Sequence, residues 1–213
     1  MYKLCSNDFA FYEMLGQAPA LPIIKAALKE GSYLVAEKDV FTLITARSPL
    51  RTSTGQQLHI DARMPGTPYA MNMIALWMLD DFTIESGATR LVPGSHRRST
   101  FPEDGVAYPD EVSICAPAGS VLIYNGATWH GGGPKASDAS RWACLFTYGR
   151  WFLKPSFDLT QNMPRSIYEQ LDDDMKDLMG YKVTPPKDEF TRISTRSEAF
   201  IVPSDYALPL RIN

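Results

Sequence analysis

The sequence has few cysteines, and this scarcity limits the kinds of site that it can build. Its three cysteines, Cys5, Cys115 and Cys144, lie far apart and form no CxxC pair. Neither a zinc ribbon nor a disulfide framework is therefore expected. Free thiols are typical of a reducing compartment, so we expect a cytoplasmic protein.

The sequence also lacks a long apolar run. Its most apolar stretch, Tyr69 to Leu79, has about half of the roughly 20 residues that a membrane-spanning helix requires. The first residues, MYKLCSNDF, have no apolar run after their single lysine and do not resemble a signal peptide. We therefore expect a soluble protein with no membrane partner.

A strong charge of either sign is absent as well. The formal net charge is -3, which gives no electrostatic footprint for nucleic acid or for an anionic membrane. Hydrophobic residues make up 45% and charged residues 21% of the chain, an ordinary globular mixture that can bury a core. With 213 residues, we expect a single domain over 1–213. The oligomeric state stays open.

Short stretches rich in β-branched and aromatic residues fill the centre of the chain. Turns with glycine and proline separate them, which favours a mainly β sandwich or barrel. We place this core at about 33–150, with a loop over 47–55. The expected strands are two between 32 and 46, and then 56–61, 71–80, 89–92, 112–115, 120–124 and 141–148.

Two helices are expected outside this core. The first is Leu21–Lys29, with Pro22 in its first turn and Gly31 after its end. The second is Pro164–Met179, followed by a tail to residue 213 that we expect to be extended. Its acidic run, 172–174, is interpreted as a solvated helix face. Four residues spaced four, four and three apart form its apolar stripe: Ile167, Leu171, Met175 and Leu178.

A histidine and an aspartate stand two residues apart in the first of the central strands. On a strand, residues two apart point to the same face, so His59 and Asp61 are expected to project side by side. An imidazole and a carboxylate are two of the three ligands of a facial triad, which leaves open positions on iron. The third ligand must come from another segment.

Two histidines compete for that third position. His130 is expected to end the apolar strand VLIYNGATWH, and Gly131–Gly133 follow it. Glycines let the backbone approach a ligand closely. His96 ends the turn PGSH, where hydrogen bonds to the backbone are expected to fix the loop. We therefore favour His130 over His96 as the metal ligand.

An arginine follows the glycine run. Arg141 begins the strand 141–148, eleven residues after His130, and is expected to point into the same cavity. A guanidinium binds a carboxylate through two parallel hydrogen bonds, which a lysine does not reproduce. A dicarboxylate that chelates the metal at one end needs such an anchor at the other end. The combination of HxD, a distant histidine, glycines and an arginine is much rarer by chance than any one of these features.

From about Gln57 to Tyr148 the sequence resembles the phytanoyl-CoA dioxygenase family of iron(II)- and 2-oxoglutarate-dependent oxygenases. Three segments carry the resemblance: QLHIDA (57–62), ALWMLDDFTIESGATRLVPGSHRR (75–98) and GSVLIYNGATWHGGG (119–133). The resemblance implies a double-stranded β-helix, or jelly roll, with a few flanking helices. It implies His59, Asp61 and His130 as iron(II) ligands, and Arg141 as the anchor for the distal carboxylate of 2-oxoglutarate.

Two further contacts follow from the resemblance. Trp77 lies sixteen residues after Asp61, where relatives often place a cosubstrate contact, although it is equally well a core aromatic residue. Gln57 shares the expected strand face of His59 and Asp61, and is a candidate for contact with the cosubstrate or substrate. Gly132 stands where relatives often have a hydroxyl, which places more of the cosubstrate binding on Arg141.

The implied reaction uses dioxygen and 2-oxoglutarate to hydroxylate or otherwise oxidise a C–H bond of a small organic substrate. We prefer a role in natural-product biosynthesis, because the apolar central segment suits a small neutral substrate. The carboxylate of Asp61 favours hydroxylation or a related oxidation over halogenation. Two alternatives are a jelly-roll binding protein that oxidises nothing, and a metal-dependent cupin enzyme that needs no 2-oxoglutarate. The first usually loses a ligand or the arginine, and the second typically recruits more histidines.

Overall fold

A computed structural model of the chain describes residues 8–16, 19–30, 42–47, 55–138, 140–155, 159–160 and 163–181. The chain divides into two compact units, Met1–Val183 and Thr184–Asn213, and every described residue belongs to the first. The first part of the region 32–46, where two strands were expected, lies outside the described residues, as do most of the expected loop 47–55 and the tail from Lys182. Among the described residues, no helix is both long and apolar enough to cross a membrane.

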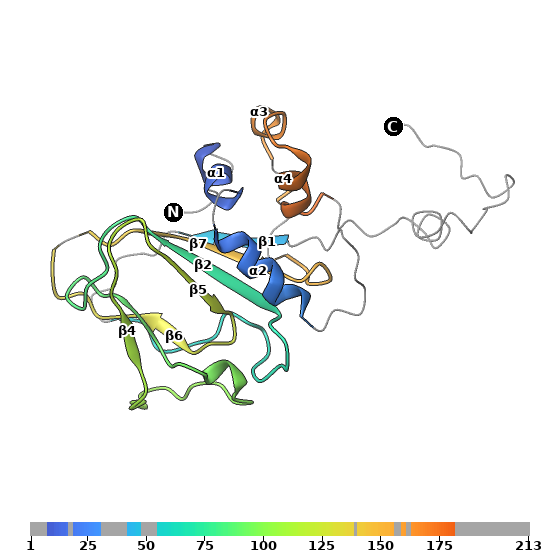
Figure 1. Ribbon diagram of the computed structural model, residues 1–213. Helices are drawn as coiled ribbons and strands as arrows, with labels where there is room; N and C mark the ends of the chain where they lie inside the picture. Colours follow the sequence, from blue (N-terminus) through green and yellow to red (C-terminus); the bar gives the residue numbers. More distant parts are fainter. Residues whose placement is uncertain are drawn as a thin grey trace, which may run out of the picture. The chain divides into compact units, whose positions relative to one another are not determined.

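The described core is mainly β structure in two antiparallel sheets (Figure 1). The larger sheet has the order β1-β7-β2-β5, and the smaller sheet has the order β4-β3-β6. The strands of the larger sheet are β1 (Thr42–Arg47), β2 (Asn72–Met78), β5 (Val121–Asn125) and β7 (Ala143–Gly149). Those of the smaller sheet are β3 (Thr89–Leu91), β4 (Val112–Ile114) and β6 (His130–Gly132).

An extended segment before β2 completes the smaller sheet. The backbone N–H of Gln56 donates to the carbonyl of Gly132 (2.8 Å), and His59 and His130 exchange backbone hydrogen bonds of 2.9 and 3.0 Å. With this segment, the chain passes between the two sheets in the order of a double-stranded β-helix. The predicted jelly roll is therefore confirmed. The predicted strand 56–61 is reduced to a bridge at His59, because Asp61 N–H donates instead to the carbonyl of Gly126 (2.8 Å).

One expected strand is divided between the two sheets. The strand expected over 120–124 is confirmed as β5, which ends at Asn125, but His130 does not end it and instead begins β6. The side chain of Asn125 accepts a hydrogen bond from the N–H of Ala127 (2.9 Å), and its carbonyl accepts one from Thr128 (2.8 Å). Such an Asx turn is typical of asparagine. The turn sends the chain from the larger to the smaller sheet, so His130 starts a strand rather than ending one.

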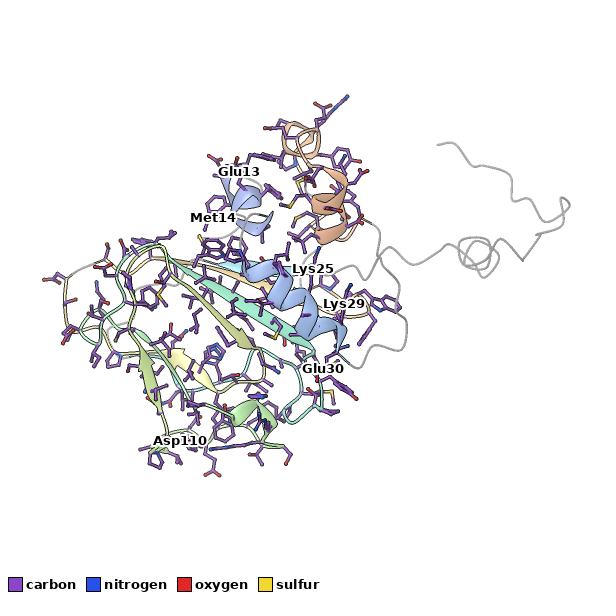
Figure 2. The ribbon with its side chains drawn as sticks, in the orientation of Figure 1. Glu13, Met14, Lys25, Lys29, Glu30 and Asp110 are labelled. Atoms are coloured by element: carbon purple, nitrogen blue, oxygen red, sulfur yellow. The ribbon has the colours of Figure 1, made fainter. Side chains whose placement is uncertain are left out.

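Helices cover one face of the larger sheet. The helix α2 (Ala20–Lys29) contacts β2 and β5, and Lys25 and Lys29 are labelled on it in Figure 2. Its buried residues include Ile24 and Leu28, so the helix predicted over Leu21–Lys29 is confirmed. Together with α1 (Ala10–Gly16), this helix packs in a cluster that contains Phe146 of β7.

The predicted helix 164–179 is two short helices, α3 (Arg165–Tyr168) and α4 (Asp173–Leu178). The break falls at Asp172, which has an extended backbone and caps α4 with its side-chain Oδ1, the acceptor for the N–H of Met175 (2.7 Å). The acidic run starts α4, where its charge favours the helix dipole, and all three of its residues are exposed, as expected of a solvated helix face. The apolar stripe still packs inward: Ile167, Leu171 and Leu178 are buried, and Met175 packs against the same cluster.

The inner face of the larger sheet turns toward the smaller sheet. Because neighbouring strand residues alternate in direction, Ile74, Leu76 and Met78 of β2 share this face with Tyr124 of β5. They pack in a second cluster with Phe82, which precedes β3. This interior between the two sheets is where the predicted ligands are found.

Candidate metal centre

The structure brings His59, Asp61 and His130 together. One ligand atom from each of the three residues can be chosen such that all lie within 4.8 Å of one another. The Nε2 atom of His130 is 3.4 Å from Asp61 Oδ2, and the Nε2 atom of His59 is 3.9 Å from Asp61 Oδ1. The pairing of His59 with β6 places the two imidazole rings 4.4 Å apart, centroid to centroid.

Backbone carbonyls fix the orientation of both imidazoles in the same way. The Nδ1 atom of His59 lies 3.0 Å from the carbonyl of Gln57, and the Nδ1 atom of His130 lies 2.9 Å from the carbonyl of Thr128. A carbonyl only accepts, so each Nδ1 carries the proton and donates it. The lone pair is then on Nε2, and both Nε2 atoms face Asp61. Such second hydrogen bonds set the tautomer and direction of metal-binding histidines.

Burial and charge favour the neutral form of His59. Burial lowers the pKa of its imidazole, and the neighbouring His130 lowers it further, whereas the Gln57 carbonyl and Asp61 act in the opposite direction. A neutral imidazole is the form that binds a metal. The side chain of His130 is 7% exposed, against 41% for His59 and 33% for Asp61. His130 therefore forms the inner wall of the cluster, and the other two residues lie at its open side.

Tyr124 borders the cluster and was not predicted as a site residue. Its ring centroid is 4.8 Å from that of His130, and its buried hydroxyl has no hydrogen-bond partner among the described residues. Burial raises the pKa of its phenol well above the usual value, and the carboxylate of Asp61 adds to this effect. The sequence signal was a tyrosine inside an apolar strand, which does not by itself distinguish a core residue from a site residue.

Arg141 lies in the same interior. It precedes β7 by two residues, and its guanidinium stacks on the ring of Phe82 at 4.8 Å from the centroid. Its Nη2 atom is 3.4 Å from the point where a Cβ on Gly132 would stand. Burial lowers the pKa of the guanidinium, and no carboxylate pairs with it in the described part of the chain. Arg141 is thus a charged donor beside the glycine strand, without an acidic neighbour.

Two other residues, Trp77 and Gln57, were predicted as cosubstrate contacts, and both contacts stay predictions. Trp77 is partly buried and packs against the helix-covered cluster, on the face of β2 opposite to Ile74 and Leu76, which fits a core aromatic residue. Gln57 is exposed, and its side chain forms no hydrogen bond within the described ranges. The neighbouring Gln56 instead reaches Gly132 with its side chain (3.0 Å).

The loop with the third histidine is fixed by a serine. Ser95 Oγ donates to the carbonyl of Val92 (2.7 Å) and accepts from the N–H of Trp129 (2.8 Å). The expectation that His96 fixes this loop was therefore wrong, because the smaller hydroxyl fits inside the turn. Nearby, Arg98 pairs with Asp110 (2.9 Å), which Figure 2 labels on the loop before β4. His96 belongs to no metal-binding group among the described residues.

Fold and site together define a class of protein. Two imidazoles and one carboxylate, held on adjacent segments inside a jelly roll, form the donor set of a facial triad. The sequence comparison agrees with this class: the profile of the phytanoyl-CoA dioxygenase (PhyH) family matches residues 15–143. The chain belongs to the phytanoyl-CoA dioxygenase family.

Relatives of this chain include bacterial and fungal proteins. An uncharacterized protein of Mycobacterium tuberculosis is 24% identical over 210 residues, which cover 98% of this chain and 72% of the relative. The dioxygenase cdmA of Talaromyces verruculosus is 33% identical over 121 residues, or 56% of this chain and 40% of the relative. The dioxygenase af480 of Aspergillus fumigatus is 30% identical over 113 residues, 52% of this chain and 36% of the relative. The chain thus spans less than half the length of these fungal dioxygenases.

Two solved structures also resemble this chain. The non-heme monooxygenase ThoJ is 20% identical, with a TM-score of 0.49, over 64% of this chain and 54% of its own. HygX from Streptomyces hygroscopicus, solved with nickel and 2-oxoglutarate, is 22% identical, with a TM-score of 0.46, over 63% of this chain and 67% of its own.

Proposed function

We propose that this protein is an iron(II)- and 2-oxoglutarate-dependent oxygenase that oxidises a C–H bond of a small organic substrate. The observation that carries the proposal is the cluster of His59, Asp61 and His130, in which both Nε2 atoms face one carboxylate. Three protein ligands of this kind leave positions open on the metal for the cosubstrate and dioxygen. Membership of a family named for a dioxygenase supports the same chemistry.

The donor set fits ferrous iron. Imidazole nitrogen and carboxylate oxygen are the ligands of non-haem iron(II) oxygenases, and the hydrogen bonds from Nδ1 keep both histidines ready to bind through Nε2. When bound together, iron(II), 2-oxoglutarate and dioxygen supply the oxidising power that removes hydrogen from a C–H bond. The protein's own residues would hold the metal at the open side of the barrel and limit the access of water.

Arg141 is proposed to bind the distal carboxylate of 2-oxoglutarate. Its guanidinium lies inside the barrel without an acidic partner among the described residues, and Phe82 supports it from one side. A planar guanidinium offers two parallel hydrogen bonds to a carboxylate. Desolvation strengthens this attraction, because the effective dielectric constant inside a protein is lower than in water.

The substrate is proposed to be a small organic molecule. The net charge of -3 offers no basic surface for a nucleic acid. Ile74 and Leu76 on the inner face of β2 pack with Phe82 and form an apolar wall of the interior. Such a wall suits an uncharged substrate. Oxidation of a natural product is the role that we favour, and the dioxygenase names of the fungal relatives agree with an oxygenase reaction.

Anaerobic titration tests the proposal. Iron(II) is added to the metal-free protein with 2-oxoglutarate, and the weak visible charge-transfer band of the chelated cosubstrate is followed. We expect the band with the wild-type protein, and an affinity for 2-oxoglutarate lowered by about tenfold or more in Arg141→Ala, since a hydrogen bond to a charged group is lost. Iron binding without a band contradicts the proposal, and favours a metal-binding jelly roll or an oxygenase that needs no 2-oxoglutarate.

A further inference from the structure

The turn PGSH contributes no ligand to the metal cluster, but it lies against the segment that leads into β6. Gly94 has a positive φ of 76°, a conformation that glycine adopts without strain, and the short helix Ser95–Arg97 follows it. Ser95, the first residue of that helix, is completely buried. A buried hydroxyl is costly unless it makes hydrogen bonds, so its partners show what it holds in place.

Ser95 holds the backbone of Trp129, the residue before His130. Its Oγ accepts from the N–H of Trp129 (2.8 Å) and donates to the carbonyl of Val92 (2.7 Å). The N–H of Val92 in turn donates to the carbonyl of Trp129 (2.9 Å). Both backbone groups of Trp129 are therefore fixed by the segment from Val92 to Ser95.

The peptide unit between Thr128 and Trp129 connects Ser95 with His130. Its N–H donates to Ser95 Oγ, and its carbonyl accepts from His130 Nδ1 (2.9 Å). A trans peptide unit is planar, and its N–H and carbonyl point in opposite directions. The hydrogen bond on one side of this plane therefore sets the direction of the other. Ser95 reaches the imidazole of His130 through one rigid group.

The corresponding hydrogen bond of His59 has no such support. Its Nδ1 lies 3.0 Å from the carbonyl of Gln57. The N–H of that peptide unit belongs to Leu58 and makes no hydrogen bond among the described residues. The two histidines thus share one kind of carbonyl contact, and a buried side chain holds only the contact of His130. This difference makes His59 an internal control.

We propose that Ser95 is a positioning residue for the metal. It holds the peptide unit between Thr128 and Trp129 so that His130 keeps its Nδ1 proton on the Thr128 carbonyl and its Nε2 toward the cluster. Hydrogen bonds in a chain polarise one another, so the hydroxyl also strengthens the bond from Nδ1. Outer partners of this kind orient metal-binding histidines and alter metal affinity. The inference rests on the proposed function, and within it on metal binding through His130.

The test removes the hydroxyl with Ser95→Ala. Ser86→Ala is the matched control, because Ser86 is also buried and its Oγ also accepts from a backbone N–H, that of Thr83 (2.9 Å). Ser86 belongs to no metal-binding group among the described residues. Titration of the metal-free protein with cobalt(II) gives the affinity of each variant, and unfolding gives its melting temperature.

Proton NMR of the cobalt(II)-bound protein adds a measurement that a general loss of stability does not mimic. The paramagnetic ion shifts the ring N–H protons of its histidine ligands away from the other signals, so His59 and His130 should give one exchangeable signal each. The more slowly exchanging signal is assigned to His130, whose side chain is 7% exposed, against 41% for His59.

We expect Ser95→Ala to lower the cobalt(II) affinity by about tenfold. The ring N–H of His130 should exchange with water about tenfold faster, since its hydrogen bond is weakened, while the signal of His59 stays as in the wild type. Ser86→Ala should lower the melting temperature by a similar amount, leave both signals in place and change the affinity by less than about twofold. If Ser95→Ala does not fold, Ser95→Cys carries the same test, because a thiol is a weaker donor and acceptor than a hydroxyl.

Three outcomes overturn this inference or the function on which it rests. Unchanged cobalt(II) affinity and an unchanged His130 signal in Ser95→Ala overturn the role of Ser95 and leave the proposed function standing. Equal changes in the signals of His59 and His130, or an equal loss of affinity in Ser86→Ala, overturn it too, because general loosening then explains the result. Failure of the wild-type protein to bind iron(II) or cobalt(II) contradicts the proposed function itself.

Discussion

The two faces of the larger sheet are built from the same strands and have different tasks. The helix-covered face is a continuous apolar core, in which Phe146 is completely buried. The inner face is apolar at Leu76 and Met78, but near β6 it carries Asn72 and Tyr124, each with a buried polar atom that lacks a partner among the described residues. On the helix-covered face, the described side chains of this sheet include one such atom, Trp77 Nε1.

The difference shows where the fold tolerates unsatisfied polar groups. Buried polar atoms without partners are rare, and each destabilises the folded state. Tyr124 contacts the ring of His130, and Asn72 packs on Gly126, whose carbonyl holds the N–H of Asp61. Both therefore border the metal cluster. The helix-covered face is thus mainly apolar core, whereas two buried polar atoms of the inner face without partners among the described residues lie near the candidate metal cluster.

The largest expected effect comes from breaking the helix-covered face. Phe146→Ala removes a fully buried ring of β7 that packs against the helices. We expect the free energy of unfolding to fall by about 3–5 kcal/mol, from lost burial and the cavity that remains. Denaturant unfolding measures this loss. Iron(II) affinity of the protein that stays folded should be unchanged, and a parallel loss of affinity would show that the two faces are not separable.

The opposite experiment breaks the inner face alone. Asp61→Ala removes one of the three ligands from the open side of the cluster. Loss of a residue that merely supports a ligand costs roughly 10–100-fold in metal affinity, so loss of the ligand itself should cost at least about 100-fold. Titration with iron(II) or cobalt(II) measures the affinity. The metal-free protein should unfold within about 1 kcal/mol of the wild type, because the substitution is not in the core. Undiminished metal affinity contradicts the assignment of the cluster.

The smallest expected effect sharpens the comparison between the faces. Tyr124→Phe removes a buried hydroxyl that has no partner in the described ranges, so the metal-free protein should become more stable by up to about 1 kcal/mol. The control is Tyr12→Phe on the helix-covered side, where the hydroxyl donates to Met163 Sδ (3.1 Å) and its loss should cost about 0.5–1 kcal/mol. Thermal or denaturant unfolding gives both values. A loss in Tyr124→Phe as large as in the control would mean that the Tyr124 hydroxyl has a partner after all.

Much of the site could be predicted because few residues can make it. With three histidines in the chain, the HxD pair left only His130 and His96 as candidates for the third ligand. The expected geometry was partly wrong, since Asp61 is not in a regular strand. It still reaches the cluster, because the carbonyl of Gly126 holds the Asp61 N–H (2.8 Å) and Ala62 donates to the same oxygen (2.8 Å).

The errors concern single-residue register and side-chain direction. Gln57 was expected to share the strand face of His59 and Asp61, but the segment pairs irregularly with β6, and it is the side chain of Gln56 that accepts from the N–H of Gly132. Trp77 was expected either at the cosubstrate or in the core. Residues alternate along β2, so the side chain of Trp77 points toward the helices, away from the face of Ile74 and Leu76. An apolar run fully buried on both faces gives no alternation from which the inner face can be identified.

The sequence by itself determined the kind of fold and the donor set, because turn residues, β-branched stretches and the scarce histidines are local features that any reader of the chain can locate. Tertiary structure decided which face of each strand carries the chemistry. It divided the strand before His130 at an Asx turn, turned both Nε2 atoms toward Asp61, and brought Arg141 close to Gly132. These outcomes depend on the register between strands distant in sequence, and that register is fixed only when the two sheets pack together.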